Sequence, residues 1–140
     1  MGVGLRFESV SSIKYDGGNY LEVAARCFDL LFRKTWEYRG ANVGPFATIG
    51  VFHNSAINLR RNEGPYDQYV PDYTRSFAVG GEMQWLFQGV FLVGFETGYQ
   101  WLVLGPAGRA DGTRLLDATG SEFTTDMSGP HAKLLLGLSF

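Results

Sequence analysis

His53 and Ser55 are the residues whose types and spacing best suit catalysis. They lie two positions apart, so their side chains point to the same side of an extended strand. An imidazole beside a hydroxyl can act as its general base and make it a nucleophile. Asp67 follows in the same polar segment and could orient the imidazole. Together they predict a serine hydrolase site, with His53 as base, Ser55 as nucleophile and Asp67 as orienting acid.

The His-x-Ser pair resembles that of the lipid A deacylases of the bacterial outer membrane. The resemblance implies an eight-stranded barrel that removes an acyl chain from lipopolysaccharide, with His53, Ser55 and Asp67 in the roles just given. The chain departs from that family at Ala56, where the family has Asn, and its acid is Asp rather than Glu. More of the chain follows the pair than precedes it, whereas the family carries the motif in its last hairpin. A histidine at a strand end is otherwise an ordinary interfacial residue.

Few other residues suggest chemistry. Cys27 is the only cysteine, which excludes an internal disulfide and a zinc site built from several cysteines, and predicts a buried thiol. His53 and His131 are far apart in sequence, so we expect no metal site and no cofactor. The net charge is −2 and the basic residues are scattered apart from Arg60-Arg61, which argues against nucleic acid as a partner.

The composition indicates a folded chain rich in glycine and aromatic residues. The 140 residues suffice for one domain, which we expect to span 1–140. No run of about 18 apolar residues is present, so a transmembrane helix is excluded. Aromatics make up 15% of the chain and glycines number 19, and transmembrane β-barrels use both. The N-terminus has no signal-peptide pattern, so for an exported protein we expect a mature or shortened chain.

Alternation of apolar and polar residues predicts an all-β, antiparallel chain. A hairpin signal, Asp16-Gly17-Gly18-Asn19, separates the first two alternating runs. The segment 20–34 also fits a helical period, but it alternates and follows the hairpin, so a strand is the preferred interpretation. Many runs reach the roughly nine to eleven residues that cross a membrane at a tilt. The expected strands are 3–14, 20–32, 41–54, 74–87, 89–103 and 131–140.

Each expected strand has one apolar face with aromatics toward its ends and one face of glycine and isolated charges. An eight-stranded interior is filled by side chains, so we expect the charged faces to meet there and pair as a polar plug. The alternation also places His53 on the lipid-facing side with Ala47, Ile49 and Val51. The expected inward residues are Arg6, Glu8, Glu22, Arg26, Glu82, Gln84, Glu96, Gln100 and Lys133.

The connections between strands alternate in length. Short turns fall at 16–19 and 88–89, whereas 55–73 and 104–130 are long and polar. In an up-and-down barrel that ends in the periplasm, both long segments fall on the outer side. Bacterial single-chain barrels have at least about eight strands. We therefore expect about eight here, with the missing pair either inside 104–130 or N-terminal to the chain's first strand.

The last strand resembles the C-terminal assembly signal of bacterial outer-membrane barrels. Residues 133–140 alternate in polarity and end on Phe140. The resemblance covers this strand alone. It implies an up-and-down transmembrane β-barrel in the outer membrane, in contact with lipid and lipopolysaccharide.

The sequence leaves several functions open. The first is a non-enzymatic, porin-like outer-membrane barrel whose loops 55–73 and 104–130 have a structural role or bind a protein partner. The second is a lipopolysaccharide deacylase that uses His53 and Ser55. The third is a soluble, lipocalin-like barrel, in which the apolar strand faces line a cavity for an apolar ligand.

Overall fold

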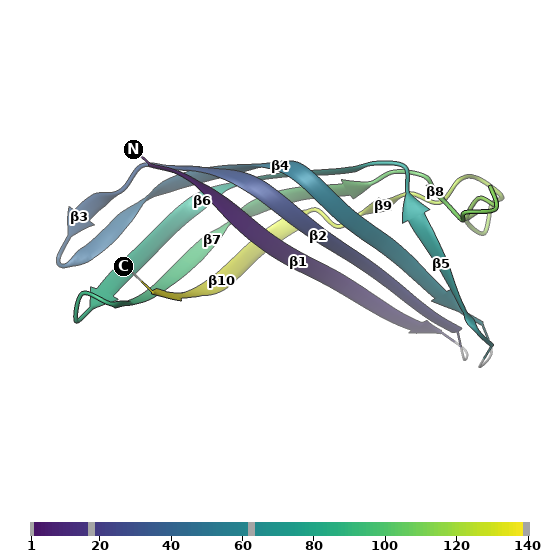
Figure 1. Cartoon of the computed structure of the whole chain (residues 1–140), viewed down its shortest axis with the longest axis horizontal. Coiled ribbons are helices and arrows are strands. Elements are labelled where there is room, and N and C mark those ends of the chain that lie inside the picture. Colours follow the sequence, from purple (N-terminus) through teal and green to yellow (C-terminus); the bar gives the residue numbers. More distant parts are fainter. Residues whose placement is uncertain (1, 17–18, 62–63, 139–140) are drawn as a thin grey trace.

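Antiparallel strands make up most of the described chain. The computed structural model describes residues 2–16, 19–61 and 64–138, so the expected terminal Phe140 lies outside the described residues. The main sheet runs up and down in the order β1-β2-β4-β6-β7-β10 (Figure 1). The all-β, antiparallel class expected from the sequence is confirmed. The long strands are β1 (Gly2–Asp16), β2 (Asn19–Arg33), β4 (Ala41–Arg60), β6 (Thr74–Phe87), β7 (Phe91–Leu104) and β10 (Gly129–Leu138).

Short strands occupy the connections. β3 (Trp36–Tyr38) forms a hairpin with the start of β4, and β5 (Tyr66–Pro71) pairs with its end. β8 (Ala107–Gly108) pairs with β5, and β9 (Thr125–Asp126) pairs with β7. Within 104–130, which is described throughout, no strand is long enough to cross a membrane, so the extra pair is not found there.

β4 is longer than the sequence pattern predicts. It continues to Arg60, whereas the pattern ends it at Asn54 and assigns Ser55 to a polar loop. The extension has a strand's alternation, because Ser55 and Ile57 are buried while Asn54 is exposed. It pairs with β2 on one side and its last part pairs with β5 on the other.

The two ends of the sheet differ in their connections. The start of β1, the end of β10, the β3–β4 turn and the β6–β7 turn lie at one end (Figure 1). The first hairpin and both long connections lie at the other. The long connections therefore share one end, as expected from their alternation with short turns.

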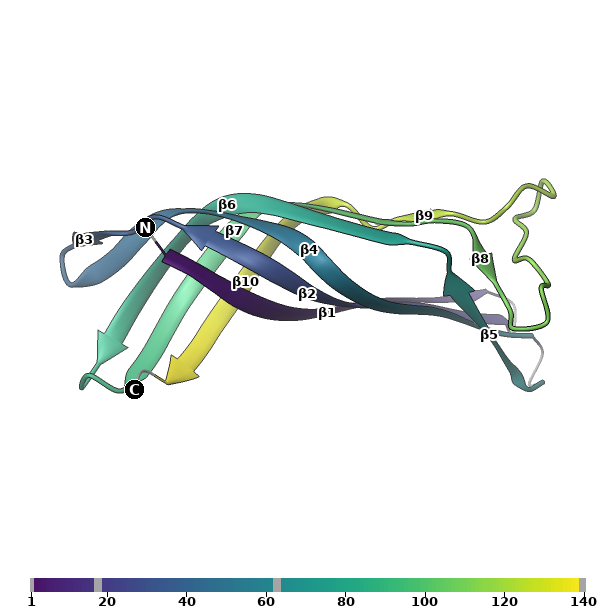
Figure 2. The same ribbon diagram turned by 45° about the horizontal axis from the view of Figure 1, so that its top comes forward.

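The sheet is strongly curved but does not close. β1 and β10 are its edges, and each pairs with a neighbour on one side only. Figure 2 shows the curvature of the sheet, with β1 and β10 as its two edge strands. Side chains span the gap, since Lys133 Nζ lies 2.7 Å from Glu8 Oε1. A closed barrel and its strand number are therefore not established by this fold.

A β-bulge in β4 reverses its faces. The register with β2 shifts between Phe28 and Asp29, where Val51 is the extra residue on β4. After the bulge, side chains point to the face opposite to the one that simple alternation predicts. His53 therefore points inward and contacts Ser76. The expectation that His53 shares a lipid-facing side with Val51 is wrong, because one extra residue inverts the alternation.

The faces of β2 are also the reverse of those expected. Val23, Ala25 and Cys27 are buried, whereas Arg26 is exposed and Glu22 accepts a hydrogen bond from Asn58. The pattern misleads because the inner residues here are small and apolar and pack into a core. Glu22 and Arg26 are therefore not inward residues. The other expected inward residues lie on the inner face and are buried or half-buried: Arg6, Glu8, Glu82, Gln84, Glu96, Gln100 and Lys133.

Close approach of β6 and β7 requires glycine at Gly98. It pairs with Gly80, and a Cβ on it would meet the Val79 carbonyl oxygen and the Gly80 backbone. We expect Gly98→Ala to destabilise the sheet by about 1–3 kcal/mol, the usual cost of overpacking. Urea unfolding of the folded chain would measure it. Gly81→Ala is the matched control, because its Cβ would meet nothing within 4 Å, and an equal loss in both variants would contradict the prediction.

Candidate functional site

The structure does not bring together the three residues of the predicted triad. His53 and Ser55 lie on one inner face of β4, as their spacing predicted. However, the Ser55 hydroxyl accepts a hydrogen bond of 2.9 Å from Thr74 and has no contact of that kind with His53. Asp67 lies in β5 and forms an ion pair of 2.9 Å with Arg109. The imidazole of His53 therefore has other partners.

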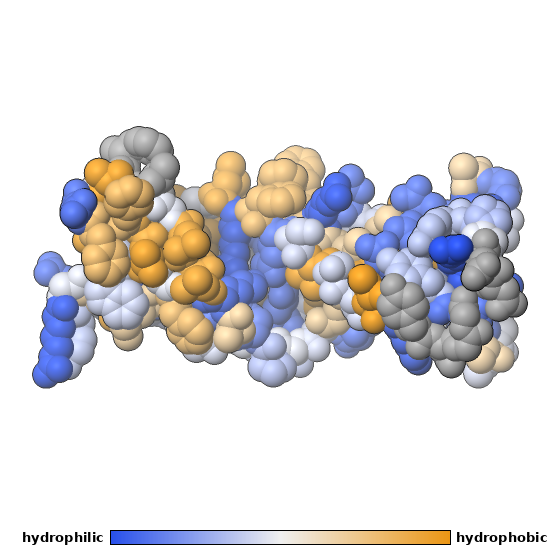
Figure 3. Space-filling model, turned by 90° about the horizontal axis from the view of Figure 1, so that it is seen from below, coloured by the Kyte–Doolittle hydropathy of each residue, from blue (hydrophilic) through white to orange (hydrophobic). Residues whose placement is uncertain are grey.

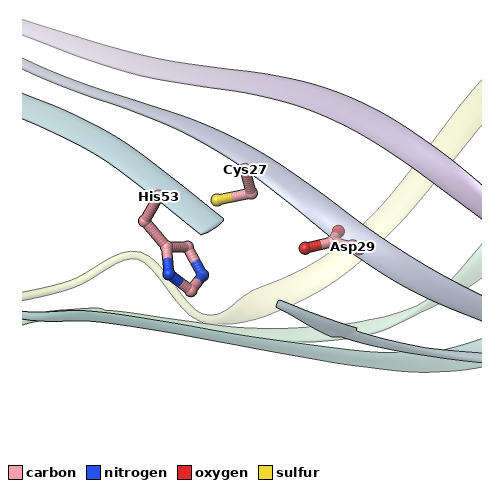
Figure 4. Close-up of side chains that lie close together, drawn as sticks. All are labelled: Cys27, Asp29 and His53. Atoms are coloured by element: carbon pink, nitrogen blue, oxygen red, sulfur yellow. The ribbon is translucent and has the colours of Figure 1, made fainter. Parts of the chain in front are cut away.

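His53 belongs to a polar cluster formed by β2, β4 and β6. Its ring nitrogen, the Cys27 sulfur and an Asp29 carboxylate oxygen all lie within 4.8 Å of one another. Figure 4 shows Cys27 and Asp29 on the same strand, with the His53 ring beside them. Cys27 and Asp29 are 0% and 1% exposed. Sequence reasoning missed this cluster, because only the register of β2 with β4 and the bulge place His53 beside Cys27.

Ser76 links the members of this cluster by hydrogen bonds. Its hydroxyl donates to Asp29 Oδ1 at 2.9 Å and lies 3.1 Å from His53 Nε2. A hydroxyl has one proton, so Nε2 must carry the proton in the contact with His53. In this arrangement the imidazole is a donor and not a base toward Ser76. Ser76 thus joins His53 and Asp29 into one hydrogen-bonded set of side chains.

A second polar group joins β1, β7 and β10 across the interior. Arg6 donates to both carboxylate oxygens of Glu96 at 2.8 Å, and His131 Nε2 lies 2.9 Å from Glu96 Oε1. Lys133 pairs with Glu8, which also lies 3.6 Å from Arg6. The expectation that inward charges pair with one another is confirmed for these residues. We call this group the interior ion network.

A cavity of about 940 Å³ follows the gap between β1 and β10. Its inner wall is polar and contains members of the interior ion network together with Glu82, Gln84 and Gln100. Leu5, Phe7 and Leu134 line its rim. The gap thus joins a charged interior to an apolar outer surface.

The long connections form ordered, polar structure at the far end of the sheet. Arg114 donates to both oxygens of Asp72 at 2.8 and 2.7 Å, and that carboxylate raises the pKa of the guanidinium. Asp117 accepts hydrogen bonds from Thr119 and Ser121, which lower the pKa of its carboxyl group. A cavity of about 440 Å³ lies between 70–72 and 108–114. These contacts give this end of the sheet a defined surface.

Apolar side chains cover the outer face of the half of the sheet nearest the chain termini. Leu5 and Leu134 are 81% and 70% exposed. Figure 3 shows apolar residues gathered over this half, while the other half is mainly hydrophilic. The exposed apolar residues on the outer face are Val3, Leu5, Phe7, Phe28, Phe32, Ile49, Val51, Phe52, Phe77, Val79, Met83, Trp85, Phe87, Phe91, Phe95, Leu134 and Leu136. We call this surface the outer apolar band.

The polarity of the interior and of the outer face is reversed between the half of the sheet under the outer apolar band and the half near the long connections. Beneath the outer apolar band the interior holds buried charges, Glu96 and Asp29 among them. Toward the long connections the interior becomes a hydrophobic core around Ile57, Leu102 and Leu104, and the outer face becomes polar. The exposed outer residues in that half include Ser9, Ser11, Arg26, Asn54 and Arg75.

Aromatic side chains mark both limits of the outer apolar band. Trp101 stacks near Phe77 and Tyr99, with ring centroids 5.3 and 4.7 Å apart. At the other limit, Phe87 pairs with Phe91 beside the β6–β7 turn. The band between them on β6 has the length of roughly nine to eleven residues that crosses a bilayer at a tilt.

No family model, curated protein or solved structure matches the chain. No helix in the described residues is long and apolar enough to cross a membrane.

Proposed function

We propose that the chain forms the wall of a transmembrane β-barrel of a bacterial outer membrane and presents its long connections outside. The inversion of polarity along the strands carries this proposal. A protein surrounded only by water buries apolar side chains and exposes charges along its whole length. Near the long connections this sheet has an apolar interior and a polar exterior. Under the outer apolar band it has a charged interior and an apolar exterior. Lipid around that band accounts for the reversal.

The limits of the outer apolar band support the same proposal. Tryptophan and tyrosine favour the two membrane–water interfaces, where the ring lies in an apolar layer and the polar atom reaches water. Trp101 and Tyr99 lie at one limit, and Trp85 lies near the other. The apolar height between the limits fits a bilayer core crossed by tilted strands.

The alternative functions receive less support. A soluble, lipocalin-like barrel would line its cavity with the apolar faces, yet Leu5, Phe95 and Leu134 lie outside and charges lie inside. A deacylase needs its base beside its nucleophile, but Ser55 bonds with Thr74 and His53 with Ser76. A structural or protein-binding role of the outer connections is consistent with their ordered ion pairs.

In a membrane the free edges of β1 and β10 must form backbone hydrogen bonds with a neighbouring strand. Unpaired backbone groups exposed to lipid cost several kcal/mol each. Up-and-down order makes β1 and β10 antiparallel to one another. The gap can therefore close directly or with an even number of further strands. Two further strands would give the roughly eight of the smallest bacterial barrels.

Refolding from urea tests the membrane proposal. We expect β-structure by circular dichroism only when detergent micelles are present, because the outer apolar band has no apolar environment in buffer. The folded chain should also migrate differently from the boiled chain on an SDS gel. Cooperative folding to a monodisperse monomer in buffer alone would overturn the proposal.

A further inference from the structure

We propose that Cys27, Asp29 and His53 form a binding site for a divalent transition-metal ion of the zinc class. The proposal goes beyond the proposed membrane role and does not depend on it. A thiolate, a carboxylate and an imidazole are the donor types that zinc accepts in proteins. Three protein ligands leave a fourth position for water or another molecule, as in metal sites that take part in reactions.

The donor atoms are already close to the spacing that one ion requires. They lie within 4.8 Å of one another. Ligands of a tetrahedral zinc ion, bound at about 2.0–2.3 Å, lie roughly 3.3–3.8 Å apart. Closing this difference takes shifts of about 1 Å or less toward a shared centre, which side-chain rotations can supply.

The backbone positions these side chains on strands and not on loops. Cys27 and Asp29 lie on one face of β2, and His53 is the register partner of Cys27. His53 faces them only because of the bulge at Val51. Gly50 leaves room for the ring, since a Cβ there would collide with His53 Nε2 and Ser76 Oγ. Bulge and glycine together shape this pocket, and bulges recur beside functional sites.

The charges of the cluster favour a cation. Asp29 is 1% exposed, and within 2–16, 19–61 and 64–138 it forms no salt bridge. A buried carboxylate stays ionised only where a positive charge lies close to it. A divalent ion would supply it and would also bind Cys27 as the thiolate. The Ser76 hydroxyl, which donates to Asp29, would then orient a metal ligand from the second layer.

Cobalt(II) and zinc(II) titrations of the refolded full chain test the site. Cys27 is the only thiol, so a thiolate-to-cobalt charge-transfer band can come from this site alone. We expect the band to appear with one ion per chain, and zinc to displace cobalt and abolish it. Zinc should also slow alkylation of Cys27. Absence of the charge-transfer band in the folded wild-type chain would overturn the proposal.

Variants assign the ligands. Cys27→Ser should abolish the band, and His53→Gln or Asp29→Asn should weaken zinc binding at least tenfold. Ser76→Ala should weaken it about 10–100-fold, as loss of an orienting partner does. Ser55→Ala, on the same inner face of β4, is the matched control and should bind as the wild type does. Equal zinc affinity in the wild type and Cys27→Ser would show that the ion binds elsewhere and would also overturn the site. If a variant fails to fold, the wild-type cobalt spectrum still decides the question.

Discussion

Glu96→Ala is expected to destabilise the folded chain by about 3–5 kcal/mol, the range for removing one partner of a buried ion pair. Glu96 is 2% exposed and receives both guanidinium hydrogen bonds of Arg6. Without it, the ion-pair partner left to Arg6 in the described part of the chain is Glu8, at 3.6 Å. The midpoint of urea unfolding in micelles measures the loss.

Two further variants test whether the loss of stability comes from breaking a buried ion pair or from removing any charge. Glu122→Ala removes the partner of an exposed ion pair with Arg114, and exposed pairs contribute about 0–1 kcal/mol. Replacing both Arg6 and Glu96 with apolar residues should recover much of the stability, because no uncompensated charge then remains. A double variant as unstable as the sum of its single substitutions would contradict this explanation.

Phe95→Arg is expected to destabilise the membrane-inserted chain by about 2–4 kcal/mol, as a cation near the middle of a bilayer does on a barrel's lipid face. Phe95 lies on the outer face of β7, is 49% exposed and pairs in register with Met83 and Leu134. If this surface faced water, a charge there would change stability by about 0.5 kcal/mol or less. Folding titrations in lipid vesicles measure the difference.

Asn54→Arg is the control for Phe95→Arg. Asn54 is exposed on the outer face of β4, beyond the outer apolar band. Arginine at this position should change the stability of the folded chain little, because this half of the sheet has a polar exterior. Equal effects at both positions would show that the band is not surrounded by lipid.

The strands were predictable because alternation has a period of two and needs no knowledge of partners. The pattern predicts a strand over 74–87, and β6 has these bounds. It also assigns Glu82 and Glu96 to the inner face correctly, because β6 and β7 contain no bulge. It fails on β2, where small apolar residues face inward into a core. An apolar side chain does not itself reveal whether it packs against protein or lipid.

The candidate site was less predictable, because its contacts join distant parts of the chain. The spacing of His53 and Ser55 correctly implied a shared face. However, the partner of His53 is Ser76 on another strand, and its neighbours Cys27 and Asp29 follow from the register of β2 with β4. Register depends on where the bulge lies. No local pattern around Val51 indicates that position.

The bulge at Val51 also constrains how this gene can change in length. Losing Val51 alone would restore simple alternation and leave His53 and Ile57 inward, because Gly50 and Phe52 already pair with consecutive residues of β2. Losing one residue elsewhere in β4 would instead turn the side chains beyond it to the opposite face. Losing two residues would shorten the strand but keep every side chain on its own side. Away from Val51, insertions and deletions that survive selection within β4 should therefore come in pairs of codons, whereas those in 105–124 are free of that parity.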